Sequence, residues 1–421
     1  MKLKKIAALL AIAGLSAPAF ATNGDNLIGL GAMSRALGGT GTAAFFGAEN
    51  TLTNPALLGK MKGTEFSIAG TAFMPDVKAS TDIAMPGTVA SKTSDADFFA
   101  IPEVSLANRL NNNWTFGLGM YGTSGMGVDY RGNDGLFHAY SNLQMMKFVP
   151  SVAYNNGNFG LGAALAIQYG ALDLNYKTPS GTVGNGNSSD FGYGVNLGAY
   201  YDVTKDFTVG VTYQSEIAMT YKDQLTTAAD GFGIGPNGMG TVTSNKLTQP
   251  EEIKLGVAYT TGPWLLTADY KRVNWSKADG YKTFNWDDQD IFGLGVKYSG
   301  NGWWLGAGYN YGKDPIKKLP DAQSMTGYSN QAINMFNNMF FPAIVENHFT
   351  FGGGMNIGKN SSLDFAVVYA SEVSKTINTG TITSVMATMP TPNPALMPVN
   401  ATTQKTDHSQ TAVTVSVRMN F

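Results

Sequence analysis

The final stretch of the chain, QTAVTVSVRMNF, alternates between two kinds of side chain. Successive residues of a β-strand point to opposite faces of the sheet, so a period of two separates them into two sets. One set suits lipid and the other suits a polar interior, which is the pattern of a strand in a transmembrane barrel. The lipid set is Thr411, Val413, Val415, Val417, Met419 and Phe421, and the polar set is Gln410, Ala412, Thr414, Ser416, Arg418 and Asn420.

Similar alternating segments recur through the chain, and many carry Tyr or Trp at one end. Aromatic side chains at strand ends are typical of the belts that meet the lipid headgroups. The number of segments is even, as in bacterial outer-membrane barrels, whose C-terminal signature the final Phe421 resembles. The pattern predicts fourteen strands, at about 64–74, 98–108, 114–121, 144–155, 159–175, 189–203, 207–221, 246–260, 264–273, 289–299, 302–311, 345–357, 362–373 and 409–421.

The connections between these segments alternate between short and long, as expected of a barrel with short periplasmic turns and long outer loops. Every second connection is short, as in YNNGN, DVTKD and TTGP. The C-terminus therefore falls on the periplasmic side. The long connections are 75–97, 122–143, 176–188, 222–245, 274–288, 312–344 and 374–408.

The composition supports the same fold class. Charged residues make up 14% of the chain, against about 25% in an average soluble domain. After residue 21, no apolar run approaches the ~18 residues of a membrane helix. Only helices and closed barrels satisfy every backbone group in lipid. The sequence therefore predicts an all-β fold, a 14-stranded antiparallel transmembrane β-barrel that crosses the outer membrane many times.

The first residues, MKLKKIAALLAIAGLSAPAFA, have the three parts of a secretory signal peptide. Lysines precede a short apolar stretch, and Ala19-Phe20-Ala21 is a small-x-small cleavage site. We expect residues 1–21 to be removed, because the apolar stretch is too short for a membrane anchor. Loss of the three lysines lowers the formal charge from −2 to −5, which argues against a nucleic-acid partner.

The stretch FFGAENTLTNPALLG, residues 45–59, is half apolar and interrupted by Gly and Pro. The region before the first strand is too short for a soluble domain and too apolar for a disordered tail. Eight strands already enclose a lumen that side chains nearly fill, so fourteen leave a wider space. We therefore expect residues 22–62 to plug the lumen as a hatch, followed by a barrel of residues 63–421.

Three stretches carry a family resemblance. One contains Asn54-Pro55-Ala56 before a strand, where Pro would set a turn that ends the hatch. Residues 249–276 end in Asn-Trp-Ser, and residues 341–354 contain Pro-Ala-x-x-Glu. These stretches resemble the hatch, a strand pair and a late strand of the FadL/TodX family, outer-membrane transporters of long-chain fatty acids and aromatic hydrocarbons. The likeness spans nearly the whole mature chain.

The resemblance implies a route for apolar molecules. They lodge among the outer loops, enter a pocket between barrel and hatch, and leave after the hatch rearranges, through a kink in the third strand. The third strand here is glycine-rich, and Gly weakens strand pairing, so Gly117, Gly119 and Gly122 are candidates for a lateral gap. The alternative is a strand that packs closely or turns at these glycines.

The outer loops differ from those of the best-known fatty-acid members, whose long third and fourth loops form the entrance groove. The third loop here, 176–188, is short, whereas the sixth contains QAINMFNNMFF, which places several apolar residues on one helical face. That face either contributes to the groove or packs against its own loop. The candidate substrate contacts are Met33, Leu37, Phe45 and Phe46 of the hatch and Phe336, Met339 and Phe340 of the sixth loop.

A fatty acid would require a cation for its carboxylate where water is scarce. The resemblance places a loop lysine near the pocket, and Lys282 is the matching residue. A neutral hydrocarbon would need none. Rival cations on or near inward faces, each of which could instead pair with an acid in the lumen, are Lys254, Lys271, Lys297 and Arg418.

The sequence contains no recognisable catalytic constellation. GLGMYG, residues 117–122, matches a dinucleotide motif, but it lies within an alternating strand with no helix after it. The chain has no Cys, which excludes disulfides and thiolate zinc sites. Asp287, Asp288 and Asp290 are either a Ca²⁺ site or, more commonly, a charged loop. We expect no enzymatic activity, no cofactor and no metal site.

These observations predict passive, ligand-gated diffusion of hydrophobic small molecules, above all long-chain fatty acids or related hydrocarbons. The expected partners are that substrate and the lipid and lipopolysaccharide of the outer membrane, around a monomer. The alternatives are a general diffusion porin, a surface adhesin or receptor that uses the loop at 374–408, and an outer-membrane enzyme.

Overall fold

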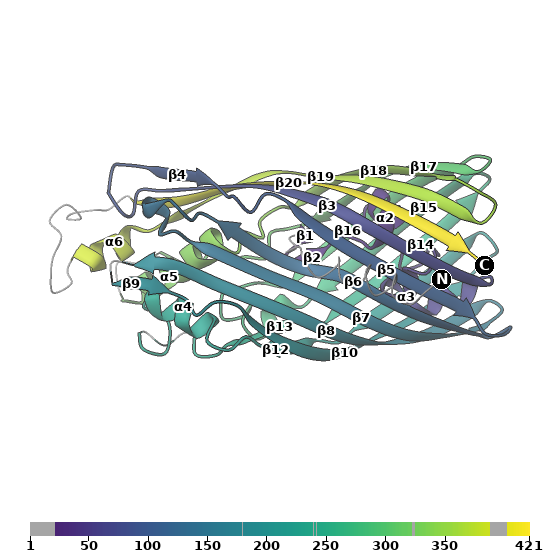
Figure 1. The fold of residues 1–421 in the computed structure, drawn as a ribbon, viewed down its shortest axis with the longest axis horizontal. Coiled ribbons are helices and arrows are strands. Elements are labelled where there is room, and N and C mark those ends of the chain that lie inside the picture. Colours follow the sequence, from purple (N-terminus) through teal and green to yellow (C-terminus); the bar gives the residue numbers. More distant parts are fainter. Residues whose placement is uncertain (1–21, 179, 239, 241, 322–324, 388–401) are drawn as a thin grey trace, which may run out of the picture.

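The computed structural model describes residues 22–178, 180–238, 240, 242–321, 325–387 and 402–421 (Figure 1). The expected signal peptide lies outside the described residues. The long loops gather at one end of the molecule, and the C-terminus and the short turns lie at the other (Figure 1). We refer to these as the outer and the periplasmic end.

Within the described residues, fourteen antiparallel strands close into a barrel, which confirms the predicted fold class. Each strand pairs with its neighbours in chain order, and the last pairs with the first, with Val415 opposite Gly70. The barrel strands are β3 (Thr64–Thr81), β5 (Phe99–Arg109), β6 (Trp114–Asp129), β7 (Tyr140–Asn156), β8 (Phe159–Thr178), β10 (Ser188–Asp202), β11 (Phe207–Gln214), β14 (Glu252–Thr261), β15 (Trp264–Val273), β16 (Gln289–Ser299), β17 (Trp303–Gly312), β18 (Asn347–Asn356), β19 (Ser361–Asn378) and β20 (Thr403–Asn420).

Shorter elements lie inside the barrel and among its outer loops. Within the described residues, no helix is long and apolar enough to cross a membrane. The short strands are β1 (Thr22–Asn23), β2 (Asn26–Leu27), β4 (Ala90–Thr93), β9 (Gly181–Val183), β12 (Ile217–Thr220) and β13 (Lys246–Gln249). The helices are α2 (Gly31–Ala36), α3 (Asn50–Thr53), η1 (Pro55–Lys60), η2 (Asp134–Leu136), α4 (Leu225–Gly231), η3 (Trp275–Lys277), α5 (Met325–Phe340) and α6 (Gly380–Ala387).

Two predicted strands are wrong in extent. The segments expected at 207–221 and 246–260 each break in two, because β12 and β13 leave the wall and pair as a separate two-stranded sheet. Pro250 lies at one break, where it has no N–H to donate to a ladder. Other strands are longer than predicted. β19 and β20 extend into the expected loop at 374–408, where the outward-facing side chains become polar and the lipid pattern disappears.

The outside of the wall is apolar between two rings of aromatic side chains. Leu255 and Leu294 are half exposed, which suits contact with lipid rather than water. One ring lies near the periplasmic turns and the other near the outer loops, as at the two interfaces of a membrane. Pairs in the first ring are Trp114–Tyr154 and Trp264–Tyr298, and pairs in the second are Tyr169–Phe191 and Tyr270–Phe292.

Inward-facing glycines of the wall leave room for the backbone of residues 22–62. A Cβ on Gly210 would lie 2.1 Å from the carbonyl oxygen of Thr42. A Cβ on Gly308 would lie 2.2 Å from the backbone nitrogen of Gly38. Gly210 is paired with Gly256 in the ladder, so several glycines lie at the same level of the wall. We call these inward-facing residues, Gly162, Gly198, Gly210, Gly256, Gly293, Gly295 and Gly308, the glycine belt.

Replacement of Gly210 by Val should displace the N-terminal segment. The three nearest atoms to the new Cβ all belong to Thr42 and Ala43. Overpacking of this kind costs about 1–3 kcal/mol, whereas Val itself favours a strand. We expect G210V to conduct ions in planar bilayers where the wild type does not.

The matched control is Gly70→Val, whose new Cβ would meet nothing within 4 Å. A silent G210V, with no conductance and an unchanged thermal transition, would contradict the role assigned to the belt.

Candidate functional site

Residues 22–62 form one segment inside the barrel, which we call the hatch. Figure 1 shows β1, β2, α2 and α3 enclosed by the wall. Every residue from 22 to 61 is buried or half-buried, although the segment has only short helices and strands of its own. The hatch therefore takes its shape from the wall.

The Asn54-Pro55-Ala56 motif begins the last element of the hatch. The Asn54 side chain accepts a hydrogen bond from the backbone N–H of Ala56, at 3.1 Å, and so caps η1. Its amide nitrogen donates to the carbonyl oxygen of Thr42, at 2.6 Å. Pro55 occupies the first position of the helix, where no N–H is needed. Gly162 and Gly198 of the wall make room for this turn.

Buried charges fix the body of the hatch to the wall. The guanidinium of Arg35 on α2 pairs with Glu103 on β5, and both side chains are almost completely buried. The other oxygen of Glu103 accepts from the backbone N–H of Gly31, at 2.7 Å. Arg418 on β20 forms a second anchor, 3.0 Å from Asp364 and 3.7 Å from Glu49 of the hatch. Removal of one partner of such a pair costs about 3–5 kcal/mol.

A polar cavity of about 80 Å³ lies between the hatch and the wall. Lys147, Lys254 and Lys271 line it together with Glu252 and residues 26–30 of the hatch. The ammonium of Lys147 donates to the side-chain oxygen of Gln214 at 3.2 Å, and that of Lys254 lies 3.3 Å from Glu252.

Lys271 makes no ion pair with any residue that the structure describes. The cavity lining therefore carries three ammonium groups and two carboxylates, Glu252 and Asp269. The space is too small for a long acyl chain unless the hatch moves.

The wall is interrupted beside this cavity. The pairing of β5 with β3 extends to Phe99, opposite Phe73, but its pairing with β6 begins only at Glu103, opposite Tyr121. Pro102 lies at this point and has no N–H to donate. β6 then has an irregularity between Gly122 and Ser124. We call this stretch between β5 and β6 the gap.

A short piece of the hatch pairs with β6 in the gap. The backbone N–H of Gly125 donates to the carbonyl oxygen of Asp25, at 3.0 Å. Asn26 is the ladder partner of Ser124, whose hydroxyl donates to the Asn26 side chain at 2.6 Å. We call residues 24–26 the arm. The arm supplies β6 with the partner that β5 does not.

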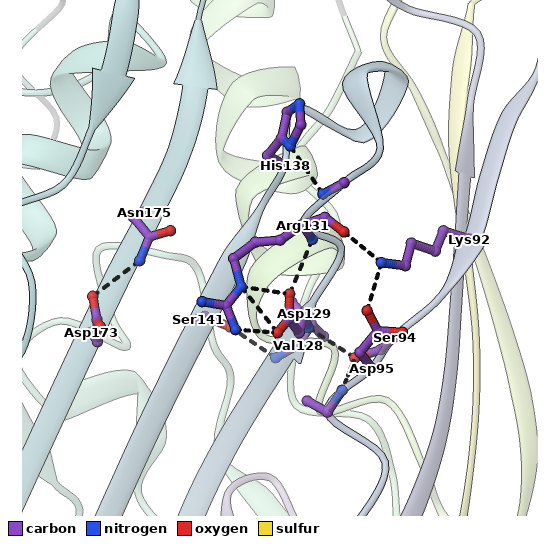
Figure 2. A network of polar contacts seen from close by, with 12 residues as sticks. Lys92, Ser94, Asp95, Val128, Asp129, Arg131, His138, Ser141, Asp173 and Asn175 are labelled. Atoms are coloured by element: carbon purple, nitrogen blue, oxygen red, sulfur yellow. Dashed lines mark hydrogen bonds and ion pairs between the residues drawn. The ribbon is translucent and has the colours of Figure 1, made fainter.

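Polar contacts close the outer edge of the gap (Figure 2). The backbone N–H of Asp95 donates to the carbonyl oxygen of Asp129, and that of Asp129 donates to the hydroxyl of Ser94, both at 2.9 Å. Lys92 donates to the carbonyl oxygen of Arg131. The gap is therefore bounded on its periplasmic side by the β5–β6 ladder and on its outer side by these contacts.

The side chains of the arm bind residues of the outer loops and of the barrel strand β14. The Asp25 carboxylate accepts from the amide of Gln249, at 2.8 Å, and from the hydroxyl of Tyr281. The Asn26 amide donates to Glu252 at 3.0 Å. Burial raises the pKa of Asp25 to about 6.

The predicted substrate contacts in the hatch do not line the cavity. Leu37 is completely buried and packs against glycines of β16 and β17. Met33 lies 3.8 Å from the ammonium of Lys297. Phe45 and Phe46 are packed within the hatch near its periplasmic side.

The predicted contacts at the outer end lie apart from these. Phe336, Met339 and Phe340 are completely buried on α5, and the Phe336 ring stacks on Phe284 at 4.8 Å. Lys282 is half exposed on an outer loop and pairs with Asp279. Asp288 and Asp290, considered as a Ca²⁺ site, are both bound by Arg272. The structure does not bring the predicted contacts into one pocket.

The three glycines predicted as lateral-gap candidates lie in two different environments. Gly117 and Gly119 lie where β6 is paired on both sides, and an added Cβ would clash with Leu58 at the first and Tyr121 at the second. Gly122 borders the irregularity. The sequence signals that were missed are Pro102 at the end of the ladder and Lys147 as an inward charge in an apolar strand.

Comparison with known proteins places this architecture in a family. The family model for outer membrane protein transport protein (OMPP1/FadL/TodX) matches residues 8–421. The chain belongs to this family. Membership and the barrel together place the protein in the outer membrane as a multi-pass protein.

Individual relatives are distant. The long-chain fatty acid transport protein of Escherichia coli is 23% identical, over 68% of this chain and 75% of its own. Outer membrane protein P1 of Haemophilus influenzae is 24% identical, over 72% and 76%. Among solved structures, the Pseudomonas putida toluene transporter TodX covers 93% of this chain and 99% of its own, with 19% identity and a TM-score of 0.66. A Pseudomonas aeruginosa FadL homologue covers 94% and 100%, with 15% identity and a TM-score of 0.68.

The arm should be bound less tightly in the gap, a state that we call seated, as the pH rises. The Asp25 carboxyl has an ordinary pKa of 3.8 in water and about 6 when buried, so the seated arm binds the proton more tightly. This contribution to seating is complete below pH 3.8 and is lost as the pH rises to 6, a difference of about 3 kcal/mol. Lys147, Glu252 and Tyr281 face the same carboxyl.

The measurement is the hydrogen-exchange protection factor of the Gly125 amide between pH 4 and 7, corrected for the intrinsic exchange rate. We expect a fall of up to about 100-fold in the wild type and a flat profile in D25N. Equal slopes in the two proteins would assign the pH dependence to another group.

Proposed function

We propose that the protein carries hydrophobic small molecules, above all long-chain fatty acids, across the outer membrane by passive, ligand-gated diffusion. The observation that carries the proposal is a lumen filled by the hatch, with a small cavity beside an interrupted wall. Burial of a sixteen-carbon chain gains roughly 12 kcal/mol at ~0.8 kcal/mol per CH₂. A water-filled porin offers no such gain. Family members are transport proteins, and neither an adhesin nor an enzyme is favoured.

The parts of the chain have separate roles in this proposal. Residues 1–21 direct export, residues 22–62 act as the hatch, and residues 63–421 form the barrel. The apolar outer face contacts outer-membrane lipid and lipopolysaccharide around a single copy. The closed barrel leaves no free strand edge for pairing with a second copy. The substrate leaves sideways through the gap when the arm releases β6.

The lysines in the cavity favour an acid over a neutral hydrocarbon as the substrate. A carboxylate placed there would meet the ammonium of Lys271, which has no ion pair with a described residue, with Lys147 and Lys254 beside it. A charge-assisted hydrogen bond in a dry site is worth about 1.5–3 kcal/mol. Toluene has no anionic group that could form an ion pair with these ammonium groups.

Uptake assays in cells that lack their own transporter test the function and the substrate class together. The wild-type protein should support uptake of palmitate. Lys271→Met keeps the length of the side chain and removes its charge, so palmitate uptake should fall at least about tenfold, whereas toluene uptake, if present, should not change. Lys282→Met, at an exposed lysine, is the matched control. No palmitate uptake by the wild type would reject the function, and normal uptake by K271M would reject the role of the cation.

A disulfide tests the sideways exit. Asn26 and Ser124 are ladder partners, at a spacing that a disulfide bridges, and the chain has no other cysteine. Oxidised N26C/S124C should not transport palmitate, and reduction should restore transport. V104C/M120C joins paired residues of β5 and β6 below the gap and should transport in both states. Unimpaired transport by the oxidised N26C/S124C protein would place the exit elsewhere.

A further inference from the structure

The contacts of Asp25 join the outer loops to the gap. Tyr281, which donates to Asp25, lies in the loop between β15 and β16 and is almost completely buried. Its ring packs against Trp275 and Trp286, with centroids 4.6 and 4.8 Å away. Gln249 donates both to Asp25, at 2.8 Å, and to the Tyr281 hydroxyl, at 3.1 Å. We call Trp275, Tyr281 and Trp286 the aromatic triad.

The aromatic triad also contacts α5, a helix among the outer loops (Figure 1). The Trp286 indole N–H donates to the side-chain oxygen of Asn337 on α5, at 3.0 Å. The Asn337 amide donates to the carbonyl oxygen of Phe284, at 2.7 Å, and the Phe284 ring stacks on Phe336 of the same helix. A ligand that separates α5 from this loop must therefore disturb the triad.

The other side of the triad rests on the arm. A Cβ on Gly24 would lie 2.5 Å from the Trp275 ring, so the arm and the ring are in direct contact. The next residue, Asp25, uses its side chain for Tyr281 and Gln249 and its carbonyl oxygen for Gly125 of β6. One residue is thus bonded to an outer loop and to the gap at the same time.

We propose that Tyr281 is a positioning residue that holds the arm in the gap through Asp25 and releases it when a hydrophobic ligand displaces the aromatic triad. The arm then has two states, seated in the gap and released from it. Contacts with the outer loops shift the equilibrium between these states. This inference rests on the proposed sideways exit. It adds the residue through which a ligand at the outer end acts on the wall.

Thiol labelling at the gap measures the released state. Thr123 lines the cavity next to the arm, and its hydroxyl has no hydrogen-bond partner among the described residues, so Thr123→Cys introduces a single reporter at little cost. In this background, Tyr281→Phe keeps the ring and removes the bond to Asp25. Labelling by a small water-soluble thiol reagent should become about tenfold faster. Gln249→Met removes the amide that donates to Asp25 and to the Tyr281 hydroxyl, and it should also accelerate labelling.

Controls separate release of the arm from general loosening. Tyr130 is a buried tyrosine of the outer end whose hydroxyl also has no partner among the described residues, so Tyr130→Phe should label at the rate of the T123C parent. Asp25→Ala removes the oxygen that accepts from Tyr281. It should accelerate labelling, and Y281F should add little to D25A, because both changes remove the same bond. Additive effects of D25A and Y281F would overturn the proposed link.

Sodium palmitate supplies the second test. Below its aggregation concentration it should accelerate labelling of the T123C parent and have no further effect on T123C/Y281F. Unchanged labelling of both T123C/Y281F and T123C/Q249M, or equal acceleration by palmitate with and without the Tyr281 hydroxyl, would overturn the inference. If these results are as expected but oxidised N26C/S124C still transports palmitate, the coupling stands and the sideways exit fails.

Discussion

Every backbone N–H and C=O inside a bilayer needs a partner within the protein, because lipid offers none. The barrel meets this requirement by closing β20 onto β3. At one place the wall does not suffice, because β6 continues beyond the point where its ladder with β5 stops. The arm fills that place by accepting from Gly125. The hatch is therefore part of the wall as well as a plug, and its movement and the integrity of the wall are linked.

Close packing between the hatch and the wall explains part of the unusual composition. A lumen of this width is filled by a segment with little regular structure, so the backbone of the hatch has to approach the wall closely. Gly210 and Gly308 permit that approach where any side chain would overlap it. Asp269, at the level of the glycine belt, accepts from the N–H groups of Gly41 and Thr42, each at 2.9 Å. Part of the high glycine content therefore follows from packing one segment of the chain inside the barrel.

Alternation and connection lengths were sufficient to predict the barrel, because lipid imposes a period of two on every strand. The pattern fails where lipid ends, as in the outer parts of β19 and β20. The candidate site was less accessible to prediction, because it depends on which distant residues meet. Lys282 was a local match but lies at the surface, whereas Lys147 is in the cavity. The predicted gap glycines lie on β6, the strand whose ladder with β5 is interrupted, and Pro102 of β5 marks where that ladder stops.

The kinds of contact that hold the hatch favour a local movement over expulsion of the whole segment. Its body is held by the buried pair of Arg35 and Glu103, and breaking such a pair costs about 3–5 kcal/mol. The arm makes no ion pair with a described residue. It is held by separate hydrogen bonds, each worth about 0.5–1.5 kcal/mol net when neutral and about 1.5–3 to a charged group, to Gly125, Ser124, Tyr281, Gln249 and Glu252. The arm is also the part next to the gap. In the proposed mechanism, release of the arm alone would open the side of the barrel and leave its axis blocked, which would distinguish passage of an apolar molecule from leakage of ions.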